Sequence, residues 1–191
     1  MKKLFLLGFL GVGLILSTGA CKKKKPAVKT GISAGEVEVV LPCSEFRSDD
    51  QFFRAFAFGE SMDANVAKQK ALSNARTELA GSLNSTMKVV GDNYIKSSEF
   101  NNTEELLERF EQNARTVINQ ELRGVKTVCE RMTQVGDRRQ FRYYLALELS
   151  GGDLFDKYYQ SLTSDQSMKI DFNYERFKET FNEEMARFGG N

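Results

Sequence analysis

Side chains that could carry out chemistry are few in this sequence. It has 191 residues, three cysteines and no histidine. Histidine is the commonest general base and metal ligand, so its absence removes Ser-His and Cys-His nucleophile pairs. The sequence also contains no P-loop, no dinucleotide-binding glycine fingerprint and no calcium-loop pattern. We therefore expect a protein that is not an enzyme and that holds no metal or dissociable cofactor.

Three pairs of neighbouring carboxylates remain as candidates for acid–base work: Asp49-Asp50, Glu104-Glu105 and Glu183-Glu184. Two carboxylates roughly 5 to 10 Å apart in a cleft can serve a glycosidase. Each pair here has a simpler interpretation. Asp49-Asp50 precedes a strand, Glu104-Glu105 stabilises a helix N-terminus, and Glu183-Glu184 lies on a solvated helix face. A carboxylate-dependent hydrolase therefore remains only an alternative.

The amino-terminal residues have the pattern of a secretory signal. Lys2 and Lys3 precede an apolar run over residues 4–16, and residues 17–20 are small or polar. Positive, apolar and small-residue regions in this order are typical of a cleaved signal peptide. The apolar run is shorter than the roughly 20 residues that a membrane-spanning helix needs. We predict a signal peptide over residues 1–20.

The residues before Cys21, Leu-Ser-Thr-Gly-Ala, resemble the lipobox of bacterial lipoproteins, although the Leu lies five positions before the Cys instead of three. The resemblance implies cleavage before Cys21, a diacylglycerol on its thiol and an acyl chain on its amino group. Several acyl chains anchor a protein stably, since each buried methylene contributes about 0.8 kcal/mol. The alternative is an ordinary signal peptide with an incidental cysteine. The residue after Cys21 is Lys and not Asp, which favours the outer membrane over the inner membrane.

Residues 21–35 contain five lysines, one proline and no apolar periodicity, and we predict a lipidated basic tether there. The lysines would lie near anionic head groups or act as a solvated spacer. Residues 30–191 carry 20 basic and 26 acidic side chains, a net charge of −6. This acidic balance argues against a nucleic-acid partner.

Cys43 and Cys129 are the two cysteines left in the domain. In a secreted chain they are candidates for a disulfide. The bridge would close a loop of about 90 residues, for which loop entropy predicts about 4–5 kcal/mol of stabilisation. Two buried free thiols are the alternative. A redox-active pair is disfavoured because no Cys-x-x-Cys motif is present.

The first half of the domain, predicted over residues 36–191, begins with two strands. Residues 36–41 alternate briefly and suggest a short edge strand. Residues 52–59 alternate with apolar residues on both faces, which predicts a strand that is central or covered on both sides. A long helix capped by Ser61 or Asp63 follows, with a stripe that should approach the sheet closely (Ala64, Ala67, Ala71, Ala75 and Leu79).

A second helix is predicted from Thr103, as N-cap, to about Leu122. Residues 125–135 and 140–150 read as a hairpin, and Asp153 is expected to cap a short helix. Residues 171–188 form an amphipathic helix whose aromatic stripe we expect to pack on its own domain. The fold class is therefore α+β, with a small mixed or antiparallel sheet packed on the alanine-rich helix and further helices. Tyr144, Tyr158 and Tyr159 are candidate interface residues, with one tyrosine of the 158–159 pair pointing outward.

Residues 54–80, RAFAFGESMDANVAKQKALSNARTELA, resemble a segment of the 20-kilodalton family of small outer-membrane lipoproteins, which is related to the amino-terminal domain of flagellar assembly protein T. The shared pattern is a strand ending in Ala-x-Gly followed by an alanine-rich helix with an Ala-Arg pair. The resemblance implies an envelope lipoprotein and supplies no catalytic residues. We expect a lipid-anchored, non-enzymatic protein that docks on another envelope protein. A binding module for a glycan or small molecule is the alternative.

Overall fold

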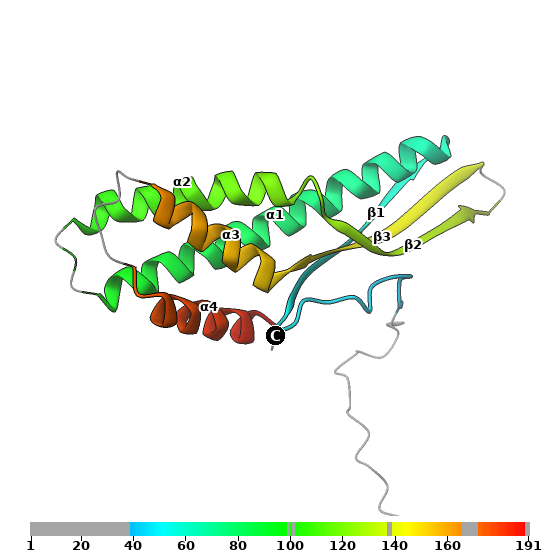
Figure 1. The fold of residues 1–191 in the computed structure, drawn as a ribbon. Coiled ribbons are helices and arrows are strands. Elements are labelled where there is room, and N and C mark those ends of the chain that lie inside the picture. Colours follow the sequence, from blue (N-terminus) through cyan, green and yellow to red (C-terminus); the bar gives the residue numbers. More distant parts are fainter. Residues whose placement is uncertain (1–38, 99, 101, 137–138, 166–171, 190–191) are drawn as a thin grey trace, which may run out of the picture. The chain divides into compact units, whose positions relative to one another are not determined.

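The computed structural model describes residues 39–98, 100, 102–136, 139–165 and 172–189. The chain divides into two units, Met1–Val39 and Val40–Asn191, and every described helix and strand belongs to the second. In chain order the elements are β1 (Phe52–Ser61), α1 (Ala64–Lys96), α2 (Thr103–Glu121), β2 (Lys126–Val135), β3 (Gln140–Ser150), α3 (Gly151–Ser164) and α4 (Tyr174–Gly189) (Figure 1). This confirms the α+β class.

The three strands form one antiparallel sheet in the order β1-β3-β2. The β3 strand is central, which explains why residues 143–147 are buried on both faces. The β1 strand lies at an edge and is covered on both faces, which is the second of the two predicted alternatives. Its alternation was right: Phe53, Ala55 and Ala57 are buried against the helical layer, while the intervening side chains point to the other face.

The α1 helix packs along β1 at very short range. A Cβ atom added to Gly59 would lie 2.4 Å from the carbonyl oxygen of Ala67 and 2.5 Å from the backbone nitrogen of Ala71. Only glycine in the strand and alanine in the helix allow this approach. Asp63 caps the helix by accepting hydrogen bonds from the backbone of Asn65 and Val66. The alanine stripe predicted from the sequence is thereby confirmed.

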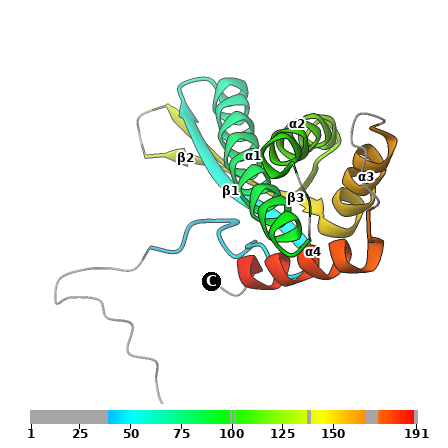
Figure 2. The same cartoon turned by 90° about the vertical axis from the view of Figure 1, so that its left-hand side faces the viewer.

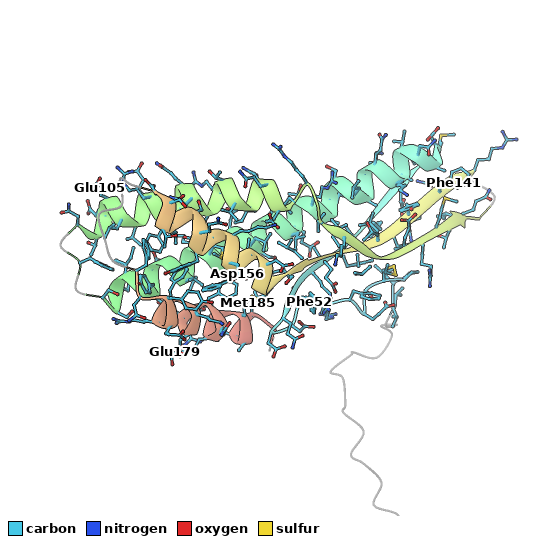
Figure 3. All side chains as sticks on the ribbon, in the orientation of Figure 1. Phe52, Glu105, Phe141, Asp156, Glu179 and Met185 are labelled. Carbon is cyan, nitrogen blue, oxygen red and sulfur yellow. A yellow bond between two sulfur atoms is a disulfide. The ribbon has the colours of Figure 1, made fainter. Side chains whose placement is uncertain are left out.

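The other helices build an aromatic core at one end of the molecule's sheet. The α2 helix packs on α1, α3 packs on α2, and α4 packs on α1 and α3 (Figure 2). Phe110, Phe155, Tyr158 and Phe177 are buried together, and the hydroxyl of Tyr158 donates to the carbonyl oxygen of Phe110 at 3.0 Å. The aromatic stripe of the last helix therefore packs on its own domain, as predicted. Met185 of this stripe reaches Gly151 at the start of α3 (Figure 3).

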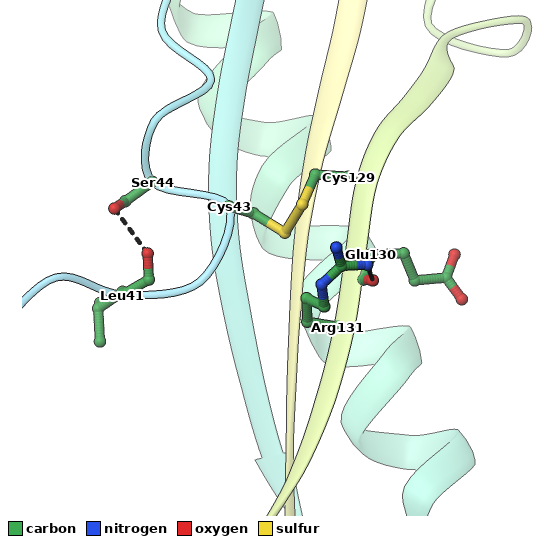
Figure 4. Close-up of a disulfide and its surroundings, with 6 residues drawn as sticks. All are labelled: Leu41, Cys43, Ser44, Cys129, Glu130 and Arg131. Carbon is green, nitrogen blue, oxygen red and sulfur yellow. Dashed lines mark hydrogen bonds between the residues drawn. A yellow bond between two sulfur atoms is a disulfide. The ribbon is translucent and has the colours of Figure 1, made fainter.

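The second face of the sheet is covered by residues 40–50, which we call the strap. Leu41 and Phe46 pack on Phe56, Tyr144 and Ala146 in a small core separate from the helical one. The sheet thus lies between α1 on one side and the strap on the other (Figure 4).

Several predicted boundaries need correction. Residues 39–41 are not a strand and residues 42–45 form a turn, while residues 36–38 lie outside the described residues. Asn102 precedes α2 in place of Thr103, and Ser150 caps α3 in place of Asp153, accepting from the Asp153 backbone nitrogen. The α1 helix continues through Gly81 and Gly91 to Lys96. The signal peptide, the tether and Cys21 also lie outside the described part of the chain.

Candidate functional site

The strap is tied to the far edge of the sheet by a disulfide. Cys43 and Cys129 are bonded in the structure, with their Cα atoms 5.6 Å apart (Figure 4). Cys43 has a φ of 69°, in the left-handed region that residues other than glycine rarely adopt. The bridge joins a segment that precedes β1 to β2, the strand at the opposite edge of the sheet. It holds the strap over Tyr144 and Ala146.

Arg54 of β1 fixes the other end of the strap. Its Nε donates to Glu148 of β3 at 2.6 Å, and its Nη1 donates to Asp49 at 2.5 Å and to the carbonyl oxygen of Arg47 at 2.9 Å. Desolvation opposes ionisation of Asp49, but hydrogen bonds from Gln51, Arg54 and Phe52 outweigh it and hold the Asp49 pKa below its ordinary value. This cluster is a structural joint between strap and sheet, with its charges already paired.

The strap also closes part of the exposed edge of β1. The backbone nitrogen of Phe52 donates to Asp49 at 2.8 Å, and its carbonyl oxygen accepts from the Asp49 backbone at 3.0 Å. The Ser48 hydroxyl accepts from the Arg54 backbone nitrogen at 2.8 Å and donates to the Arg54 carbonyl oxygen at 3.0 Å. Backbone groups that would otherwise be open at this edge are thus satisfied.

The α1 helix caps two further positions of the same edge with side chains one turn apart. Lys70 donates to the carbonyl oxygen of Glu60 at 3.1 Å, and Asn74 donates to that of Phe58 at 3.2 Å. All these capped residues have even numbers, as expected when alternate residues of an antiparallel edge strand turn their backbone groups outward.

The opposite edge of the sheet, formed by β2, is open. Most β2 side chains are exposed, and Met132 is 54% exposed. By the same alternation, the register with β3 turns the backbone groups of Glu130, Met132 and Gln134 outward. Among the described residues, the structure gives these groups one partner, the guanidinium of Arg131 on the Glu130 carbonyl oxygen at 3.1 Å. The β2 edge is therefore available for pairing with another strand.

A polar group fastens β2 to α1. Glu130 accepts hydrogen bonds from the Tyr143 hydroxyl and, at 3.0 Å, from Lys68. These two bonds lower the Glu130 pKa, and desolvation together with Glu130 raises the Tyr143 pKa. Lys68 also lies 5.3 Å from the centre of the Tyr143 ring. The group is best explained as a fastening of the hairpin to α1.

A groove of about 430 Å³ lies beside β1, and we call it the strap groove. Three half-buried phenyl rings line it, from the strap (Phe46), from β1 (Phe56) and from α4 (Phe188). The exposed Glu78 of α1 lines it as well, and partial desolvation of its carboxylate raises the Glu78 pKa. The remaining lining residues are Ser44, Arg47, Ser48, Arg54 and Ser82.

A second cavity, of about 380 Å³, contains three carboxylates at the start of α3. Glu121 is bound to Lys157 at 2.7 Å, and Glu148 is bound to Arg54 at 2.6 Å. The third, Asp153, lies in the first turn of α3. Two of the three carboxylates are thus held in ion pairs, which gives a hydrolase no support here. Within the described residues, no group of three or more Cys, Asp or Glu side chains could hold a metal ion.

The three carboxylate pairs named from the sequence have structural roles. Asp49 caps β1 and binds Arg54. Glu105 binds Arg109 within α2. Glu184 was expected on a solvated face and is instead buried, where it accepts from Asn93 of α1 at 2.9 Å and pairs with Arg187.

The predicted tyrosine interface is not assembled. Tyr144 is 5% exposed because the strap covers it, and Tyr158 is fully buried beneath Phe177. Only Tyr159 is partly exposed, and its ring lies against Tyr174 of α4. The prediction that Tyr144 points outward was therefore wrong.

The sequence analysis did not find Glu78 or the open β2 edge. Glu78 looked like an ordinary solvated helix residue, and the edge position of β2 depends on the strand order. The sequence contained one indication of the ion-pair cluster around Arg54. This arginine is the one charged residue among phenylalanines on one face of the predicted strand, and a charge in such surroundings requires an acidic partner.

No protein-family model, no curated protein and no solved structure matches this chain. The resemblance to small outer-membrane lipoproteins therefore stays a prediction. In the part of the chain that the structure describes, no helix is long and apolar enough to cross a membrane.

Proposed function

We propose that this chain is a lipid-anchored protein of the bacterial cell envelope, held at the outer membrane by acylated Cys21. In this proposal it performs no catalysis and docks on another envelope protein. The lipobox-like sequence and the basic tether support the anchor. The observation that carries the docking function is the asymmetry of the sheet: side chains cap the β1 edge, whereas the β2 edge is left open with Met132 exposed on it.

The mode of docking is strand addition. An extended segment of the partner would pair with the outward backbone groups of Glu130, Met132 and Gln134, and Met132 would supply apolar contact. Lys126 and Arg131 on the same strand oppose non-specific edge pairing, because charged side chains discourage aggregation at open edges. The partner therefore has to offer a strand that accommodates positive charge.

The test is cross-linking and affinity recovery from native membranes with three variants. Met132→Pro removes an outward N–H without breaking a bond to β3, so recovery of the partner should fall at least about tenfold. Met132→Ala keeps the backbone donor and should reduce recovery less. Cys21→Ser should release the protein from the membrane and lower recovery through loss of local concentration.

Two results would overturn docking through β2. The first is equal recovery of the same partner by the wild type and by Met132→Pro. The second is a concentration-dependent dimer of Val40–Asn191 in sedimentation experiments that Met132→Pro abolishes, since the edge would then pair with a second copy of this chain.

A binding module for a glycan or small molecule is the alternative function. The specific observation in its favour is the strap groove, where half-buried rings and polar groups converge. The groove lies by the β1 edge and shares no residue with the open edge of β2.

A further inference from the structure

The α1 side chains that cap β1 lie in a row, and the third residue of this row is a hydrogen-bond acceptor whereas the first two are donors. Lys70, Asn74 and Glu78 are spaced four residues apart on one side of the helix. The first two donate hydrogen bonds to the carbonyl oxygens of Glu60 and Phe58. Two strand residues span about 6.6 Å and four helix residues about 6 Å, so the third position of the row, Glu78, comes opposite Phe56.

An ionised carboxylate cannot repeat the bond that its neighbours make. Lys70 and Asn74 are donors, but Glu78 carries only acceptors and faces the outward carbonyl oxygen of Phe56, which is an acceptor too. Within the described residues, the structure shows no hydrogen bond or ion pair for the Glu78 side chain and no bond that caps the Phe56 carbonyl oxygen. The capped edge therefore has one gap, and this gap opens into the strap groove.

We propose that the strap groove binds a primary ammonium group on an aliphatic stem, as carried by a lysine side chain of a partner peptide. An ammonium group has three N–H donors, which match the Glu78 carboxylate and the Phe56 carbonyl oxygen together. The rings of Phe46, Phe56 and Phe188 would cover the stem and attract the cation. The groove's 430 Å³ is sufficient for one long side chain and its flanking peptide bonds.

The charges around the groove agree with this ligand. Arg54, the buried cation of the lining, is already paired with Asp49 and Glu148. Arg47 is exposed, and the carbonyl groups of a bound peptide would give its guanidinium a partner. Partial desolvation raises the Glu78 pKa, and a bound ammonium group would favour the charged carboxylate and lower that pKa again.

The inference gives the alternative function a ligand class and does not depend on docking through β2. The experiment is an NMR titration of the Val40–Asn191 unit, which contains every described helix, strand and core residue. The probe is N-acetyl-lysine methylamide, and its norleucine counterpart lacks only the ammonium group. We expect saturable shifts at Phe56 and Glu78, with lysine at least about tenfold tighter than norleucine.

Variants separate recognition from folding. Glu78→Gln should lose the lysine preference and raise the urea midpoint, because the glutamine amide can donate to Phe56 as Asn74 does to Phe58. The matched control is Glu179→Gln on the exposed face of α4, which should change neither. Phe46→Leu keeps apolar volume without the ring and should weaken lysine binding at least threefold. Met132→Pro should bind lysine normally, so failure of β2 docking and failure of this proposal are distinguishable.

Four outcomes would overturn the proposal. Equal shifts from lysine and norleucine would remove the role of the ammonium group, and full affinity in Glu78→Gln would remove that of the carboxylate. Absence of saturable shifts from the lysine probe would exclude the site, and saturation of the same amides by a neutral oligosaccharide alone would assign the groove to a glycan.

Discussion

Gly59 and Gly81 lie in neighbouring elements but differ in the space around them. A Cβ atom at Gly59 would meet the backbone of Ala67 and Ala71 within 2.5 Å, whereas at Gly81 nothing lies within 4 Å. Gly59→Ala should therefore destabilise the fold by at least about 2 kcal/mol, since neither backbone can withdraw. Gly81→Ala should stabilise it by about 0.5–1 kcal/mol, because alanine favours the helix.

Urea unfolding of the two variants, followed by circular dichroism, measures both effects. The opposite signs exclude a general effect of adding a methyl group. A Gly59→Ala variant as stable as the wild type would show that β1 and α1 do not pack at this distance.

Arg54 shows how much of a site can be read from one residue in its sequence context. Its position among phenylalanines on one strand face predicts buried ion pairing, and the structure provides Asp49 and Glu148. The identity of those partners could not be predicted, because Glu148 lies 94 residues away in the chain. Glu78 shows the reverse case: its role depends on the register between α1 and β1, which no local pattern reports.

At the scale of elements, the strap is the segment most dependent on a single bond. It has no regular secondary structure, and it covers Tyr144 and Ala146 with a few apolar contacts. Breaking Cys43–Cys129 should cost about 2–4 kcal/mol of stability, mainly through the freedom regained by the unfolded chain. Cys43→Ser, Cys129→Ser and the double variant should lose the same amount, since each removes the same bridge.

Peptide mapping without reductant supplies the direct measurement for this prediction. We expect one linked pair containing Cys43 and Cys129, and tyrosine fluorescence should change on reduction as the strap exposes Tyr144. Free thiols at both positions would contradict the bridge, and additive losses in the double variant would contradict its single origin.

The elements themselves were largely predictable because their signals are local. The alternation of residues 52–59 and 140–150 and the alanine stripe of α1 each depend on neighbours within a few turns or residues. The errors were non-local. The open edge of β2 depends on the strand order, and the burial of Tyr144 depends on a strap joined across 86 residues of sequence. The N-cap positions at Asn102 and Ser150 differed from the predicted Thr103 and Asp153 because Asn, Asp, Ser and Thr are all favoured at an N-cap, so residue type alone does not select among neighbours.

At the scale of the whole molecule, charge divides the chain into a basic leader and an acidic domain. Seven lysines and no acids lie in residues 1–29, and residues 30–191 have a net charge of −6. A domain with this charge is repelled by an anionic bilayer surface, so the proposed attachment depends on the acyl chains, and the basic tether adds a weaker contact.

This arrangement predicts different salt responses for two variants expressed as full chains in a bacterial host. Wild type should stay in the membrane fraction after a wash with 1 M salt, because the insertion of acyl chains into the bilayer is insensitive to ionic strength. At this salt concentration the Debye length is about 3 Å, so the attraction between the lysines and anionic head groups is screened. Replacing Lys22–Lys25 with serine should leave the protein membrane-bound, provided that Cys21 is acylated. Cys21→Ser should instead appear in the soluble fraction after the wash, with the tether alone holding it weakly at low salt.

Mass spectrometry of the amino-terminal peptide should find diacylglycerol and an acyl chain on Cys21. An unmodified Cys21 in membrane-bound protein would contradict the anchor, and it would leave the β2 edge as the attachment that holds the domain at the membrane.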